Sequence, residues 1–88
     1  MDIIITGHAR FEAERRGITE ELINSVIQAP QQKLPSKKGR VILQSRYRDT
    51  IENKEMLLRI VVSETTDAFT VLTVYKTSRI SKYWTGGK

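Results

Sequence analysis

Residues 56–63 read Met56-Leu57-Leu58-Arg59-Ile60-Val61-Val62-Ser63, an apolar run interrupted by a single cation. A run of this length, rich in β-branched residues, predicts a strand, and its near-continuous apolar character is typical of a central strand covered on parts of both faces. The flanking segments, 49–55 and 64–68, are polar and contain the Asn and Asp residues that favour turns. The run therefore predicts the middle strand of an antiparallel meander.

Strands on both sides of this run are predicted from the alternation of side chains. In residues 41–48 one face is mainly apolar and carries Val41, Leu43, Ser45 and Tyr47. The other face carries Ile42, Gln44, Arg46 and Arg48. In residues 69–76, strict alternation would place four side chains on one face: Phe69, Val71, Thr73 and Tyr75.

The N-terminal part predicts a short strand and two helices. Ile3–Ile5 is β-branched and suits a strand. Thr6 or Gly7 can cap a helix over residues 8–16, which are rich in good helix formers. They end at Gly17, a residue that often closes helices in the left-handed conformation. Thr19 is an N-cap for a second helix, whose apolar residues recur at helical spacing and which ends before Pro30.

The remaining segments complete the predicted fold. Residues 31–39 contain proline, serine and a lysine pair, which predicts a loop. Thr77 or Ser78 can cap a short helix that reaches Trp84. Together the elements predict an α+β domain, in which two N-terminal helices pack on a curved antiparallel sheet of three to four strands that is followed by a short C-terminal helix.

Composition limits the class of protein. The length of 88 residues suits a single domain, 1–88, of which residues 84–88 are expected to fray. The chain has no cysteine, which excludes disulfides, thiolate catalysis and cysteine-based zinc sites and is compatible with a reducing cytosol. The apolar run Ile3–Ile5 is too short for a signal peptide or a membrane span, so we expect a cytoplasmic protein without a membrane partner.

Charge is unevenly distributed along the chain. Residues 1–30 carry three cations and five anions, net −2, whereas residues 31–88 carry twelve cations and five anions, net +7. A basic sheet half favours an anionic partner, either nucleic acid or an acidic protein. The alternative is a solvated surface that keeps a small protein soluble.

Several local patterns occur in the same order as in a known family. They are His8-Ala9, Arg16-Gly17-Ile18-Thr19-Glu20-Glu21, Gly39-Arg40, Leu58-Arg59-Ile60-Val61-Val62, Val74-Tyr75-Lys76-Thr77-Ser78 and Lys82-Tyr83-Trp84. On these residues the chain resembles the small bacterial and archaeal family called domain of unknown function 4258. That family is similar in outline to the RelE and BrnT type toxins, which place helices before an antiparallel sheet and whose better-known members cut RNA without a metal. The resemblance implies a RelE-like fold, an RNA target and an acidic antitoxin-like partner. The chain differs from many relatives at Glu12, where they carry arginine.

Metal-independent RNA cleavage needs proton transfer to and from the reacting oxygens and cations that stabilise charge on the phosphate. The catalytic candidates are His8, Arg59 and Thr77. His8 is the only histidine in the chain, and histidine exchanges protons near neutral pH. The alternatives are that His8 caps or packs its helix, that Arg59 forms a structural salt bridge with Glu14, and that Thr77 caps the last helix.

Candidate RNA-binding residues are cations and one hydroxyl on the first helix, the strands and the C-terminal segment: Arg15, Arg46, Arg48, Lys76, Ser78, Arg79 and Lys82. Arg46 and Arg48 are two strand residues apart, roughly 6 to 7 Å, which suits adjacent phosphates. The alternative for this pair is a solvated sheet face. Tyr75, Tyr83 and Trp84 either stack on bases or close the core.

The sequence implies no metal and no cofactor, because it has one histidine, no cysteine and no glycine-rich phosphate loop. The leading hypothesis is an RNA-binding protein that acts as a metal-independent ribonuclease of RelE or BrnT toxin type. The alternative is a non-catalytic module that binds RNA or an acidic protein.

Overall fold

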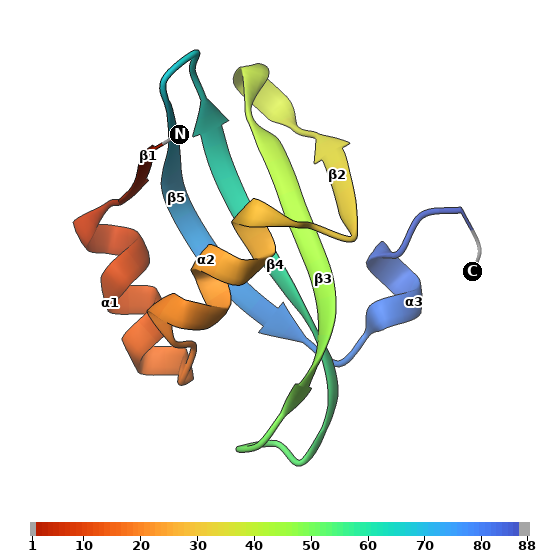
Figure 1. Ribbon diagram of the computed structural model, residues 1–88. Coiled ribbons are helices and arrows are strands. Elements are labelled where there is room, and N and C mark those ends of the chain that lie inside the picture. The colour runs from red at the N-terminus through yellow and green to blue at the C-terminus, as the bar shows by residue number, and fades with distance from the viewer. Residues whose placement is uncertain (1, 87–88) are drawn as a thin grey trace.

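The computed structural model describes residues 2–86 and confirms an α+β fold, with three α-helices and a five-stranded sheet (Figure 1). Its elements are β1 (Asp2–Ile5), α1 (Gly7–Arg16), α2 (Glu20–Gln28), β2 (Gln32–Pro35), β3 (Val41–Asp49), β4 (Lys54–Glu64), β5 (Ala68–Thr77) and α3 (Ile80–Tyr83). A 3₁₀ turn, Lys37–Gly39, connects β2 to β3.

The strand order is β1-β5-β4-β3-β2, so β4 is the middle strand, as its apolar sequence predicts. β3, β4 and β5 form the predicted antiparallel meander. β1 pairs with β5 in parallel, which makes the sheet mixed. The prediction of an antiparallel sheet of three to four strands is therefore wrong in the number of strands and in the direction of β1.

β2 lies inside the segment that the sequence predicts as a loop. Gln32–Pro35 pairs antiparallel with β3 at the edge of the sheet. A strand at an edge can form from polar residues because the ladder uses backbone groups, and proline is tolerated there because one side of the strand faces away from the sheet. For that reason the composition of this segment, which is typical of a loop, did not indicate a strand.

The predicted caps of α1 and α2 are confirmed, whereas the prediction that Thr77 or Ser78 caps the last helix is wrong: Arg79 is the N-cap of α3 and makes no side-chain cap hydrogen bond. The Thr6 hydroxyl accepts a hydrogen bond from the Ala9 N–H at 3.1 Å and caps α1. Gly17 ends α1 with a φ of 71°, a left-handed conformation that glycine adopts without steric cost. The Thr19 hydroxyl accepts from the Leu22 N–H at 3.1 Å and caps α2.

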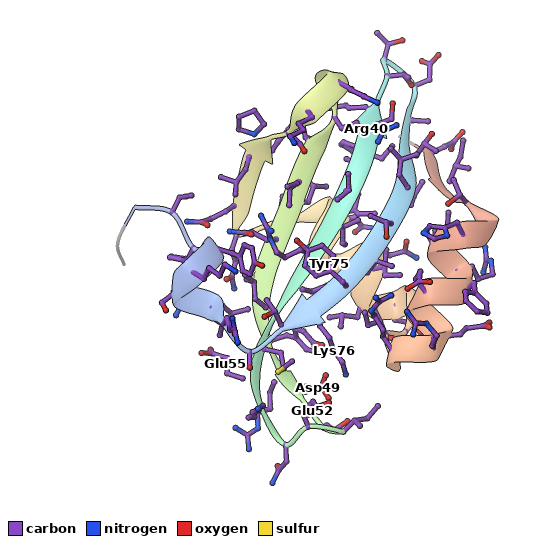
Figure 2. The ribbon with its side chains drawn as sticks, turned by 180° about the vertical axis from the view of Figure 1, so that it is seen from behind. Arg40, Asp49, Glu52, Glu55, Tyr75 and Lys76 are labelled. Atoms are coloured by element: carbon purple, nitrogen blue, oxygen red, sulfur yellow. The ribbon has the colours of Figure 1, made fainter. Side chains whose placement is uncertain are left out.

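The hydrophobic core lies between α1, α2 and one face of the sheet. It joins Ala9, Ala13, Ile18, Ile23, Val26 and Ile27 from the helical part to Leu43, Leu58, Ile60, Val62, Val71 and Val74 from the strands. We call this the helix face of the sheet and the opposite one the open face. In Figure 1 α2 crosses in front of the sheet on the helix face, and Figure 2 looks onto the open face from behind.

An irregularity in β5 changes the face of the sheet toward which the side chains of its second half point. Val62 pairs with Val71 but Val61 pairs with Thr73, so Leu72 is an extra residue between them. A one-residue bulge exchanges the faces of all side chains beyond it. Val71 therefore enters the core, whereas Tyr75 points to the open face. The predicted common face for these residues is wrong.

The C-terminal segment is partly held by contacts with the sheet. Of residues 84–88, which were expected to fray, Trp84 stacks on Arg46 and Thr85 hydrogen bonds to Gln32. Residues 87 and 88 lie outside the described part of the chain. No helix among the described residues is both long enough and apolar enough to cross a membrane.

Candidate functional site

A row of polar side chains crosses the open face. Gln32, Gln44, Arg59 and Tyr75 are consecutive partners on β2, β3, β4 and β5. Arg59 Nε donates to Gln44 Oε1 at 2.9 Å, and Arg59 Nη1 donates to Tyr75 Oη at 2.5 Å. Gln44 Nε2 donates to Gln32 Oε1 at 2.6 Å. The four side chains therefore form one continuous hydrogen-bonded row, here called the polar row.

Arg59 is the centre of the polar row and is only 7% exposed. Within residues 2–86 no carboxylate lies at ion-pair distance from it. Glu14, the partner in the alternative of a structural salt bridge, is exposed on α1 on the other side of the sheet, so that salt bridge does not form. Neutral oxygens of Gln44 and Tyr75, together with the ring of Tyr83, hold the guanidinium group instead. Such a buried cation is tolerated because its donors find acceptors.

The short helix α3 is held against the polar row by stacking interactions and by hydrogen bonds. Arg59 Cζ lies 4.2 Å from the centroid of the Tyr83 ring, and Arg46 Cζ lies 4.2 Å from that of Trp84. Gln44 Nε2 also donates to the Tyr83 carbonyl at 3.2 Å. Tyr83 and Trp84 remain half-buried, so part of each ring faces solvent. The aromatic side chains therefore both close the fold and contribute to its surface.

Cations gather around α3. Arg46 comes from β3, and Arg79 and Lys82 come from the segment around α3, where both are exposed. Arg48 is also on β3, but its Nη2 donates to the Asn53 carbonyl and to Asn53 Oδ1 at 3.1 Å, which holds it at the β3–β4 hairpin. Glu55, the cross-strand partner of Arg48, is the one carboxylate on this half of the open face among the described strand residues. We call the group of Arg46, Arg79, Lys82, Tyr83 and Trp84 the α3 surface. It combines positive charge with aromatic rings.

A cleft lies on another side of the molecule, between the end of α1, the β3–β4 hairpin and the end of β5. Its volume is about 690 Å³. It brings together four predicted site residues: Arg15, Lys76, Thr77 and Ser78. Figure 2 shows Lys76 near Asp49 and Glu52 at the lower end of the sheet.

Lys76 in this cleft forms a buried ion pair. Lys76 Nζ donates to Asp49 Oδ2 at 2.7 Å, and the two side chains are 10% and 4% exposed. The Tyr47 hydroxyl donates to the same oxygen at 2.8 Å, and the N–H groups of Ile51 and Glu52 donate to Asp49 Oδ1. Lys76 therefore anchors the hairpin to β5.

These contacts shift two pKa values. The hydrogen bond from Lys76, with further bonds from the backbone N–H groups and from Tyr47, holds the pKa of Asp49 well below its usual range. Burial, and then the hydrogen bond to Asp49, raises the pKa of Tyr47 far above its ordinary value. Asp49 is therefore ionised and Tyr47 neutral near pH 7.

The arginines at the end of α1 also have a carboxylate partner. Arg15 Nη2 donates to Glu12 Oε1 at 2.8 Å, and Arg16 forms an ion pair with the same oxygen. The cleft is lined by four cations, Arg15, Arg16, Lys54 and Lys76, and by two carboxylates, Glu14 and Glu52. Because Glu12 and Asp49 add two carboxylates that pair with three of these cations, the charges at the cleft balance. The α3 surface is the more basic of the two sites.

The structure does not bring the three catalytic candidates together. His8 is exposed in the first turn of α1, about 10 Å along the helix from Arg15, and does not line the cleft. Arg59 lies on the open face beneath α3, whereas Thr77 lines the cleft and accepts the Arg79 N–H at 3.1 Å. Among the described residues no group of His, Asp and Glu side chains could hold a metal ion.

A protein-family model described as "Domain of unknown function (DUF4258)" matches residues 5–76. The chain belongs to the DUF4258 family. No curated protein and no solved structure matches it. The DUF4258 match includes β2, β3, β4 and nearly all of β5, and thus all four residues of the polar row. It ends at Lys76, so α3 and its aromatic residues lie beyond the matched part.

Sequence reasoning missed two features of this DUF4258 chain. Gln44 was placed on the correct face, but its contact with Arg59 depends on the register between β3 and β4. Asp49 was assigned only to a turn, although it holds Lys76. The signal for Asp49 was weak, because an aspartate after a strand is also the ordinary residue of a turn.

Proposed function

We propose that this protein binds single-stranded RNA through the α3 surface. The observation that carries the proposal is the grouping of Arg46, Arg79 and Lys82 with the stacked rings of Tyr83 and Trp84, opposed by the single strand carboxylate Glu55. Cations that track a phosphate backbone and aromatic rings that stack on bases are the usual elements of single-strand binding.

The roles within the α3 surface follow from exposure. Arg79 and Lys82 are exposed and contact phosphates. Trp84 offers bases the side of its ring that Arg46 leaves free. Arg59 acts from beneath by keeping Tyr83 in place.

A RelE- or BrnT-like toxin fold is part of the proposal. It is supported by two helices, α1 and α2, that precede the antiparallel β3–β4–β5 meander. Metal-independent cleavage is the enzymatic form of the same function, and an acidic antitoxin-like protein would then be the partner that neutralises it. Because His8, Arg59 and Thr77 do not share one surface, binding is the function that the geometry supports best.

RNA binding is tested by the salt dependence of affinity for a fluorescent single-stranded RNA, measured by anisotropy. Each phosphate contact contributes about 0.7 to the slope of log K against log salt. We expect the double variant Arg79→Ala, Lys82→Ala to bind more weakly and to lower the slope by about 1.4. The matched control, Lys37→Ala with Arg40→Ala, removes two exposed cations far from α3 and should leave the slope unchanged. Equal slopes for both double variants would contradict the proposal.

Cleavage is tested separately with the same RNA in the presence of a chelator. Products that disappear in His8→Ala would support the ribonuclease form. RNA that stays intact but binds with the salt dependence described above would support binding without cleavage. Binding of an acidic protein that survives Arg79→Ala, Lys82→Ala without any RNA binding would favour the alternative of a protein-binding module.

A further inference from the structure

A row of three apolar side chains and one threonine, here called the apolar row, lies directly beside the polar row on the open face. Leu34, Ile42, Val61 and Thr73 are consecutive partners on β2, β3, β4 and β5. Tyr83 and Trp84 contact residues of the polar row and of the strand ends beyond it. The four side chains of the apolar row are half-buried, so part of each faces solvent. An antiparallel sheet with one solvated face normally presents polar residues there. The apolar row therefore requires another explanation.

A neighbouring strand extends this apolar surface. Ile4 on β1 pairs with Thr70 and points to the same face. It is 50% exposed and is one of three large hydrophobic side chains this exposed among the described residues. We call Ile4, Leu34, Ile42, Val61 and Thr73 the apolar patch. It runs across all five strands of the sheet.

The two flanks of the apolar patch have opposite charge. On the β2–β3 side stand Lys37, Lys38 and Arg40, and Figure 2 shows Arg40 at the upper end of the open face. On the β1–β5 side stand Asp2 and Asp67, which adjoin through the bond from the Asp2 N–H to the Asp67 carbonyl at 3.1 Å. All five side chains are exposed, and none forms an ion pair within residues 2–86.

We propose that the apolar patch binds a second copy of this chain face to face, about a two-fold axis parallel to β4. Such an axis exchanges the two flanks, so the cations of one copy meet the aspartates of the other. Val61 on the middle strand lies at the axis and faces its own equivalent. The two sheets pack through their open faces at the spacing usual for stacked sheets.

The opposite signs of the flanks distinguish a second copy from other occupants. An acidic protein or an RNA strand would meet Arg40 favourably but would be repelled by Asp2 and Asp67 at the other side. A second copy satisfies both flanks at once. Because the patch occupies only part of one sheet face, the interface is small and we expect a weak dimer with a Kd in the micromolar range.

The proposal is tested by sedimentation velocity from roughly 1 to 500 μM protein without RNA, a range that brackets this Kd. Wild type should shift from monomer to dimer with concentration. Arg40→Glu and Asp67→Lys should each weaken the dimer at least tenfold, because each opposes like charges across the interface. The double variant should recover much of the affinity, because the exchanged charges again face opposite ones. This recovery is specific to a self-complementary patch.

Two controls keep the test independent of folding and of RNA binding. Both charge substitutions lie at exposed positions, and circular dichroism should show unchanged thermal unfolding at low concentration. Arg79→Ala with Lys82→Ala should dimerise as wild type does even if it loses RNA binding. A wild type that stays monomeric throughout, or a double variant no better than the single ones, would overturn the proposal.

Discussion

At the scale of single residues, the ion pair of Asp49 and Lys76 shows how a residue's role depends on its partners. Asp49 accepts hydrogen bonds from Lys76, from Tyr47 and from two backbone N–H groups of the hairpin. The sequence predicts a turn for one residue and an RNA contact for the other. In the folded protein both side chains are buried and stabilise the junction of β3, β4 and β5. Removal of either partner leaves an uncompensated charge.

Asp49→Asn should lower the free energy of unfolding at pH 7 by roughly 3 kcal/mol, because Lys76 is then buried without its anion. Urea unfolding followed by circular dichroism measures the loss. Lys76→Met is the matched partner variant, since it removes the cation but retains an apolar stem. A double-mutant cycle that shows additive effects would contradict a direct interaction between the two side chains.

The pH dependence of stability should follow the same carboxylate. The pKa of Asp49 is lower in the folded than in the unfolded protein, where it is about 4. Its contribution is therefore complete above pH 4 and is lost progressively as the pH falls below this value. Between pH 6 and pH 3, wild type should lose more unfolding free energy than Asp49→Asn. Parallel stability curves would show that Asp49 does not cause the acid sensitivity.

At the scale of elements, Gly17 joins α1 to the β3–β4 hairpin. It holds a φ of 71°, and a Cβ added there would lie 2.6 Å from Ile51 Cδ1. Ile51 is 68% exposed, yet it lies against the end of α1 and helps to line the cleft. The helix stop therefore serves two purposes, since it turns the chain and makes room for the hairpin.

Gly17→Ala should destabilise the protein by about 1 to 2 kcal/mol, from the left-handed conformation together with the clash. In an Ile51→Ala background the clash is absent, so the same substitution should cost less, about 1 kcal/mol. Chemical denaturation of wild type, the two single variants and the double variant separates the cost of the left-handed conformation from the cost of the clash. An equal cost in both backgrounds would show that Ile51 moves aside without penalty.

At the scale of the whole molecule, the candidate site residues separate into two surfaces and two separate side chains. Arg46, Arg79 and Lys82 lie at α3, with Arg59 beneath it, whereas Arg15, Lys76, Thr77 and Ser78 meet in the cleft. Arg48 is held at the β3–β4 hairpin. His8 belongs to neither surface. The arrangement favours binding by the α3 surface over catalysis by the predicted trio, and the RNA and dimer experiments address opposite ends of the same sheet face.

The sequence by itself determined what depends on local interactions. Caps at Thr6, Gly17 and Thr19 define α1 and α2, because capping involves groups a few residues apart. The apolar run of β4 identified the middle strand, and alternation in β3 assigned its side chains to the correct faces. The family patterns were likewise readable along the chain, and the match to residues 5–76 confirms the family they indicated.

Only the tertiary structure decided what depends on register and on pairing between distant segments. The bulge at Leu72 moved Tyr75 to the side of Arg59, β1 joined β5 in parallel, and Gln32–Pro35 became a strand. Each of these outcomes comes from backbone hydrogen bonds between residues far apart in sequence, which no local pattern encodes. The contacts of Arg59 depend on register in the same way. Its position in an apolar strand is evident from the sequence, but its hydrogen-bond partners depend on the register of β3, β4 and β5.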